Sequence, residues 1–77
     1  MGCRIGMTTN LDQRKAYWES QYPTLRDWQV LAGPFNSKND AQKMETELAQ
    51  KHRCDSHPGG DDPDYPGALW YVYGFNF

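Results

Sequence analysis

One acidic side chain falls on the inner side of an expected helix. Residues 38–52 place apolar side chains at Ala41, Met44 and Leu48, a spacing that predicts an amphipathic helix. At about 100° per residue, Glu45 falls inside this apolar stripe, whereas Glu47 falls on the opposite side. Bulk water alone cannot solvate a carboxylate there cheaply, so Glu45 is a candidate either for chemistry or for a simple ion pair at the edge of the core.

Two cysteines and two histidines form a second candidate group. Cysteine and histidine are the usual ligands of tetrahedral zinc. The spacing His52-x-Cys54-x-x-His57 lacks a Cys-x-x-Cys pair, and Cys3 would have to arrive through the fold. The pattern therefore disfavours zinc. It favours free thiols and two solvated histidines near the end of a helix, where a histidine also suits the helix dipole.

A third group combines aromatic and basic side chains in the N-terminal part of the chain. Such a mixture can stack nucleic-acid bases and hold their backbone. The same aromatic side chains can instead pack between a helix and a sheet, and we expect this for two of the tryptophans, Trp18 and Trp28. The group comprises Arg14, Lys15, Tyr17, Trp18, Tyr22, Arg26 and Trp28.

Composition predicts one small domain over residues 1–77, with a formal net charge of −2. Residues 1–26 hold four basic and two acidic side chains, whereas residues 55–77 hold four aspartates and no Lys or Arg, so a nucleic acid would approach the N-terminal half. There is no signal-peptide pattern and no apolar run of membrane-spanning length. We therefore expect a soluble cytoplasmic protein without a membrane partner.

The expected elements make a small α/β (α+β) domain. Residues 3–7 predict a strand, and Thr9 or Asn10 can cap a helix over 11–20. Residues 27–33 predict a strand that ends at Gly33-Pro34, and Ser37 can cap the helix over 38–52. Residues 55–67 predict a loop, and 69–75 a strand that is apolar on both faces. The result is a three-stranded, mainly antiparallel sheet with two main helices and a central C-terminal strand.

Residues 3–52 resemble part of the GIY-YIG nuclease domain. In that family a strand ending in Tyr-Ile-Gly precedes a Thr- and Asn-rich turn and a helix with an arginine. Ile5-Gly6 and Arg14 match this signature in type and spacing, whereas Arg4 stands where the family usually has tyrosine. Residues 41–48, with Glu45, resemble the family's later helix, whose glutamate holds a divalent metal.

The family's first strand, which carries Gly-Ile-Tyr, has no counterpart before Cys3. The strand over 69–75 has the right character, so we hypothesise a circularly permuted arrangement in which the C-terminus supplies it. Chain termini that lie close together permit such an arrangement. Either Tyr71 or Tyr73 would then take the place of the family's first tyrosine. Register alone does not choose between them, because a slip of one residue reverses the faces of a strand.

The resemblance implies hydrolysis of DNA phosphodiesters with Mg²⁺ or Mn²⁺. Glu45 would hold the metal, Arg14 would contact the phosphate, and Tyr71 or Tyr73 would help to activate or orient water. Because Arg4 replaces a tyrosine, the site is either active or degenerate, and a degenerate domain would be a non-catalytic module that binds nucleic acid or protein. Specificity would come from the fold itself or from a partner subunit. The expected contacts with nucleic acid are Arg4, Lys15, Tyr17 and Arg26.

A rival interpretation concerns residues 27–48. The segment Trp28–Phe35, followed by Ala41 and Leu48, resembles the opening of a SPOR domain, a small module that binds peptidoglycan. This likeness covers less than a third of the chain and leaves residues 3–18 unexplained. Glu45 discriminates between the two, because a SPOR-like domain has no use for a carboxylate facing a groove beside Arg14.

Overall fold

The computed structural model describes residues 2–56 and 65–77, which form an α+β fold with two helices and a mixed sheet. The N-terminal half runs through β1 (Cys3–Thr8), α1 (Leu11–Gln21) and β2 (Arg26–Phe35). The rest runs through α2 (Lys38–His52), the short β3 (Asp55–Ser56) and β4 (Trp70–Asn76). In this described part, neither helix is long and apolar enough to cross a membrane.

The sheet has four strands in the order β2-β4-β1-β3, so the expectation of three was wrong by one. The additional strand lies within the segment expected to be a loop, where Asp55 and Ser56 pair in parallel with Arg4 and Ile5. A two-residue strand is too short to leave a periodic signal in a sequence. The C-terminal strand β4 lies between β2 and β1 and is antiparallel to both, which confirms its inner position.

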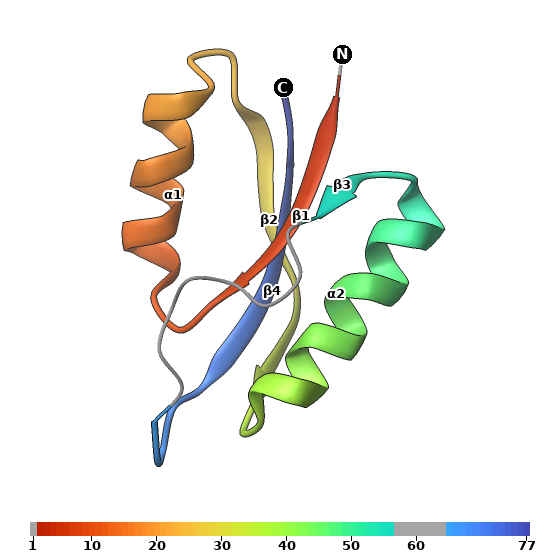
Figure 1. The fold of residues 1–77 in the computed structure, drawn as a ribbon. Coiled ribbons are helices and arrows are strands. Elements are labelled where there is room, and N and C mark those ends of the chain that lie inside the picture. The colour runs from red at the N-terminus through yellow and green to blue at the C-terminus, as the bar shows by residue number, and fades with distance from the viewer. Residues whose placement is uncertain (1, 57–64) are drawn as a thin grey trace.

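The sheet separates two chemically different layers (Figure 1). Helix α2 covers one face, where Ile5, Met7, Trp70 and Val72 belong to the buried core. The alternate residues of β4, including Tyr73 and Phe75, lie on the other face, beside α1, because successive side chains of a strand point to opposite sides. That second layer is aromatic and contains rings from α1, β2 and β4 in mutual contact.

Both helices begin where their capping residues predict. The Asn10 side chain accepts a hydrogen bond from the Gln13 backbone N–H (3.1 Å), and Ser37 accepts one from that of Asp40 (3.4 Å). Helix α2 buries Ala41, Glu45 and Ala49, whereas α1 buries none of its residues. Helix α1 is therefore held to the sheet by a few half-buried side chains rather than by an apolar stripe.

Strand β2 continues through Gly33-Pro34, where the sequence predicted its end. Pro34 lacks a backbone N–H, which an edge strand tolerates because one side of it has no neighbouring strand. Gly33 has φ of 114°, and a Cβ at this position would lie 2.8 Å from the Trp70 carbonyl oxygen. The pairing of β2 with β4 is irregular along this stretch, so glycine and proline mark a bulged edge here, not a strand end.

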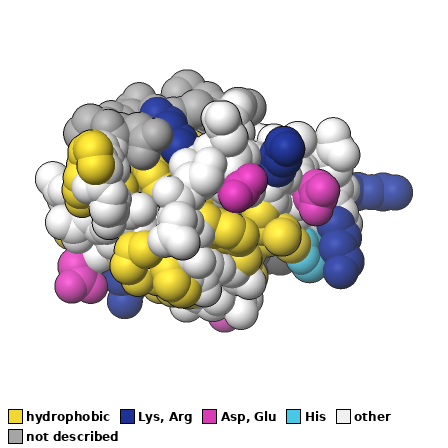
Figure 2. Space-filling view, turned by 90° about the horizontal axis from the view of Figure 1, so that it is seen from below, with side chains coloured by type: hydrophobic (Ala, Val, Ile, Leu, Met, Phe, Trp, Pro, Cys, Tyr) yellow, Lys and Arg dark blue, Asp and Glu magenta, His cyan; other side chains and the backbone are white. Residues whose placement is uncertain are grey.

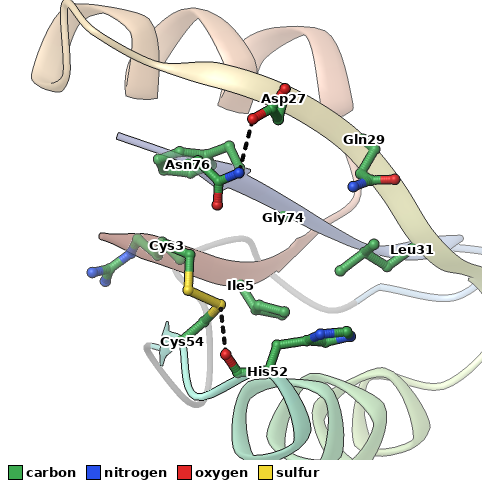
Figure 3. A pocket seen from close by; sticks show the side chains of 11 residues that line it. Cys3, Ile5, Asp27, Gln29, Leu31, His52, Cys54, Gly74 and Asn76 are labelled. Carbon is green, nitrogen blue, oxygen red and sulfur yellow. Dashed lines mark hydrogen bonds between the residues drawn. A yellow bond between two sulfur atoms is a disulfide. The ribbon is translucent and has the colours of Figure 1, made fainter. Parts of the chain in front are cut away.

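The two ends of the described chain are joined. Gly2 and Phe77 exchange backbone hydrogen bonds of 2.7 and 2.9 Å, and both ends lie at the same end of the sheet (Figure 1). Beside them, Cys3 of β1 and Cys54, just after α2, form a disulfide (Figure 3). The expectation of free thiols was therefore wrong. Two cysteines 51 residues apart give no spacing signal, and only the pairing of β1 with β3 brings them together.

The disulfide should contribute strongly to stability, because it closes a long loop in the unfolded chain. We expect reduction, or the Cys54→Ser substitution, to lower the free energy of unfolding by about 2–4 kcal/mol. Urea denaturation with and without a thiol reductant measures this difference. The serine variant is the control, since a reductant should leave its unfolding midpoint unchanged. A wild-type midpoint that does not respond to reductant would contradict the cross-link.

Candidate functional site

Glu45 is the most unusual side chain of the described structure. It lies in the middle of α2 with a relative exposure of 0%, on the same face as Ala41 and Ala49. Within the described part of the chain, neither carboxylate oxygen has a hydrogen-bond partner. Buried charges in proteins are normally paired or bound to a metal. The simplest structural explanation, a hydrogen-bonded pair between Arg14 and Glu45, does not form.

Burial dominates the electrostatics of this carboxylate. Loss of solvent raises the pKa of Glu45 from 4.5 to about 7, and the positive charge of Arg4 opposes this shift in part. The Arg4 guanidinium lies over the Trp18 ring on the other face of the sheet, so its charge acts on Glu45 across the sheet and not through a contact. The group is thus poised to change its charge near neutral pH.

Tyr73 is the residue that links the predicted site together. It is 3% exposed and lies opposite Gly6 in the pairing of β1 with β4. A Cβ on Gly6 would lie 2.4 Å from the Tyr73 hydroxyl oxygen, so only glycine leaves room for the phenol at this position. Burial raises the pKa of Tyr73 to about 12. The Trp18 hydrogen bond and the charges of Arg14 and Arg4 oppose the shift, and Glu45 adds to it.

Three charged residues that the sequence selected influence the pKa of Tyr73: Arg14 of α1, Arg4 of β1 and Glu45 of α2. Arg4 and Arg14 lie on the same side of the sheet as the phenol, whereas Glu45 lies on the opposite side, under α2. The two arginines also lie over aromatic rings, Arg4 at 4.6 Å from the Trp18 centroid and Arg14 at 5.4 Å from that of Tyr17. Such contacts hold a guanidinium in place. The two cations and the phenol thus lie on one side of the sheet, and the buried carboxylate lies on the other.

The other predicted residues lie outside this neighbourhood. Tyr71 is half-buried on the same face of β4 as Tyr73, but it lies beside Gly33 at the β2 edge. Lys15 and Tyr17 are exposed on α1. Arg26 is the first residue of β2, and its Nε lies 3.9 Å from the carboxylate Oδ2 of Asp27. Of the two tyrosines that the sequence left open, Tyr73 is the one whose pKa responds to the charges of Arg14 and Glu45.

Nothing in the sequence indicated that Trp18 forms a hydrogen bond with a predicted site residue. The Trp18 indole N–H donates a hydrogen bond of 2.8 Å to the Tyr73 hydroxyl, across 55 residues of chain. The sequence assigned Trp18 only to packing, and its ring does stack on Tyr22 and contact Phe75. No local pattern signals a bond between residues so far apart, since it depends on where α1 crosses the sheet.

Two members of the cysteine and histidine group are engaged with each other. Cys3 and Cys54 are bonded to each other, and the His52 ring extends away from them (Figure 3). His57 lies outside the described residues. Within residues 2–56 and 65–77, no three His, Cys, Asp or Glu side chains are grouped as metal ligands. The disulfide instead borders an open hollow of about 290 Å³ between β2 and the end of α2.

The described residues form no concentrated positive surface on the face seen from below in Figure 2. Figure 2 shows hydrophobic side chains gathered there, with Lys, Arg and acidic side chains interspersed around them. The large hydrophobic residues exposed in the described structure are Tyr17, Val30, Tyr65 and Leu69.

Among the predicted site residues, Glu45 is the one whose side chain could bind a hard cation such as Mg²⁺. Glu45 is an orphaned buried carboxylate, and Mg²⁺ can be held by one or two carboxylates while it keeps several waters. A bound cation would also offset the cost of ionising Glu45, because its positive charge would stabilise the carboxylate and lower the pKa of this side chain. The residues present fit a metal held by Glu45 and water, and they do not fit a closed cage of protein ligands.

Comparison with known protein families, curated proteins and solved structures found no match to this chain.

The buried carboxylate should make stability depend on pH. Folding raises the pKa of Glu45 from 4.5 to about 7, so the folded state holds this proton more tightly than the unfolded chain. Stability should be full below pH 4.5 and decline as pH rises to about 7, by about 3 kcal/mol in total. Urea unfolding at a series of pH values measures this decline.

The Glu45→Gln variant should lose this decline, and Glu47→Gln should retain it. Glu47 is an exposed carboxylate two residues along the same helix, so it controls for the general effect of removing a negative charge. Equal pH dependence in the wild type and in Glu45→Gln would show that Glu45 does not titrate as its burial requires.

Proposed function

We propose that this chain is a divalent-metal-dependent endonuclease-like domain that acts on DNA phosphodiesters, with the permuted GIY-YIG-like arrangement that its sequence suggests. The observation that carries the proposal is the unpartnered, fully buried carboxylate of Glu45. Arg4, Arg14 and Tyr73 lie on the other side of the sheet, and Glu45 influences the pKa of Tyr73 from across it. The four residues come from four separate elements, α2, β1, α1 and β4.

Each residue has a definite task in this proposal. Arg14 and Arg4 neutralise the charge of a phosphodiester, and their contacts with aromatic rings hold them ready to do so. Tyr73 orients water or a phosphate oxygen through its hydroxyl. Glu45 holds Mg²⁺ or Mn²⁺, which when bound would stabilise the leaving oxygen. The contribution of Tyr71 is to packing at the β2 edge rather than to the reaction.

The complete burial of Glu45 favours a second candidate, a non-catalytic module of the same design. A carboxylate with no exposure must gain access to solvent before a hydrated cation can reach it. If that access never opens, Arg4 and Arg14 still present two cations to a nucleic acid. The peptidoglycan-binding interpretation remains a prediction from residues 27–48 and gives Glu45 no task.

The cytoplasm remains our proposed location for this protein. The Cys3–Cys54 bond argues against this location, because most cytoplasmic proteins keep their thiols reduced. Reduction would remove the covalent link between β1 and the segment after α2, while β1 remains paired with β4. Any DNA structure preference would come from the fold or from a partner subunit.

Catalysis should depend on Glu45 and Arg14 together. We expect Mg²⁺-dependent cleavage of supercoiled or branched DNA to fall at least about a hundredfold in both Glu45→Gln and Arg14→Ala, because each removes a charge from the reacting centre. Gel electrophoresis of the DNA products measures the rate, and circular dichroism checks that the variants fold. Glu47→Gln is the matched control and should cut at the wild-type rate.

Thermal unfolding separates the two candidates. If Glu45 binds a metal, Mg²⁺ at neutral pH should raise the melting temperature of the wild type but not that of Glu45→Gln. A wild type that neither cuts DNA nor responds to Mg²⁺ or Mn²⁺ would reject the nuclease proposal. Retained DNA binding would then support the non-catalytic module, and retention on peptidoglycan would support the rival.

A further inference from the structure

The Cys3–Cys54 disulfide lies at the surface of the molecule, between two hollows. Both cysteines are half-buried, and the contacts of their sulfur atoms with the backbone are exposed. One hollow, of about 290 Å³, is bordered by both cysteines and by Gly74, which has no side chain to fill it (Figure 3). Among the described residues, Cys3 and not Cys54 borders the other hollow, of about 310 Å³. The two hollows therefore expose Cys3 on two sides and Cys54 on one.

The surroundings of the disulfide also suit its reduced form. Cys3 Sγ lies 3.9 Å from the Arg53 carbonyl oxygen, and Cys54 Sγ lies 3.7 Å from that of His52. A disulfide sulfur has no hydrogen to donate, whereas a thiol is a weak donor. Each thiol would therefore find an acceptor nearby. Strand β1 would stay in the sheet, because all six of its residues pair with β4. The disulfide can thus open and close within one fold.

The charged side chains near Cys3 favour an anionic ligand. Arg26 and Arg53 border the second hollow together with Cys3, and no described acidic side chain borders it. Asp27, whose Oδ2 lies 3.9 Å from the Arg26 Nε, borders the first hollow instead. A carboxylate in the second hollow would be attracted by the two guanidinium groups, and a neutral group would not.

We propose that Cys3–Cys54 is a redox-active disulfide, which exchanges with a small thiol that carries carboxylates through a mixed disulfide on Cys3. The thiolate sulfur of the small molecule attacks Cys3 Sγ and forms a new S–S bond. The Cys3–Cys54 bond breaks, and its electron pair leaves on Cys54 Sγ, which takes up the proton that the attacking thiol lost. This inference does not depend on the proposed function.

The mixed disulfide has two outcomes, and both conserve electrons. Cys54 can attack Cys3 Sγ, which restores the protein disulfide and releases the small thiol. Alternatively, a second molecule of the thiol attacks the sulfur of the bound one, and Cys3 leaves as a thiol. The protein disulfide is then reduced to two thiols, while two small thiols are oxidised to their own disulfide.

Single-cysteine variants trap the mixed disulfide. Cys54→Ser leaves Cys3 free and Cys3→Ser leaves Cys54 free, so both variants lose the same cross-link. With oxidised glutathione, we expect Cys54→Ser to gain one glutathione about tenfold faster than Cys3→Ser, because Cys3 borders both hollows. Mass spectrometry of the intact protein measures the rates, and circular dichroism checks that both variants fold. Equal rates, or a faster reaction at Cys54, would overturn the proposal.

The wild type keeps the test independent of how the variants fold. Reduced glutathione should open the disulfide and oxidised glutathione should close it again, with the circular dichroism spectrum unchanged throughout. Alkylation of the freed thiols, followed by mass spectrometry, counts them at each stage. If glutathione opens the bond only when the folded spectrum is lost, the disulfide is a structural cross-link and the proposal fails.

The preference for an anionic thiol has its own control. Introduced into Cys54→Ser, Arg53→Gln should slow the reaction with oxidised glutathione about threefold, and should leave the reaction with the neutral disulfide of 2-mercaptoethanol unchanged. Lys51→Gln removes another cation from the last turn of α2, outside the described lining of the hollow, and should change neither rate. Equal slowing of both reagents by Arg53→Gln, or equal effects of Arg53→Gln and Lys51→Gln, would overturn the choice of an anionic ligand.

Discussion

The close approach of the Tyr73 phenol to the backbone of Gly6 is the constraint on which this structure depends. It fixes the pairing of β1 with β4, since a Cβ at Gly6 would collide with the hydroxyl. With the register set, Ile5 and Met7 lie on the face that α2 covers, while Arg4 lies on the aromatic side. A single glycine thus sorts the flanking residues into a core layer and a charged, aromatic layer.

The two layers make opposite contributions to stability. The α2 side buries aliphatic residues around Trp70 and Val72, which stabilises the fold through the hydrophobic effect. The same helix also buries Glu45, whose ionisation opposes folding above its raised pKa. A domain of this size has a small stability margin, so the Cys3–Cys54 bond between β1 and the segment after α2 offsets a substantial part of that cost. Residues that a fold tolerates at such a cost are candidates for function.

The sequence was informative where the signal is local. Ser37 and the pair Thr9 or Asn10 marked the helix starts, with Asn10 the cap that forms, and helical periodicity placed Glu45 on the inner face of α2. It failed where the outcome depends on contacts between distant segments. Gly33-Pro34 looks like a strand end, yet an edge strand accommodates it. The choice between Tyr71 and Tyr73, the partner of Cys3 and the bond from Trp18 all depend on strand register and helix placement, which no short motif encodes.

Arg4 gives the proposed site its particular character. At a position where the resembling family usually has a neutral phenol, this chain has a cation that lies over Trp18. From there its charge partly opposes the rise of the Glu45 pKa, although the two side chains lie on opposite faces of the sheet. If the proposed function holds, the same charge would attract a phosphodiester with or without a metal, so the replacement of a phenol by Arg4 would favour binding more than hydrolysis.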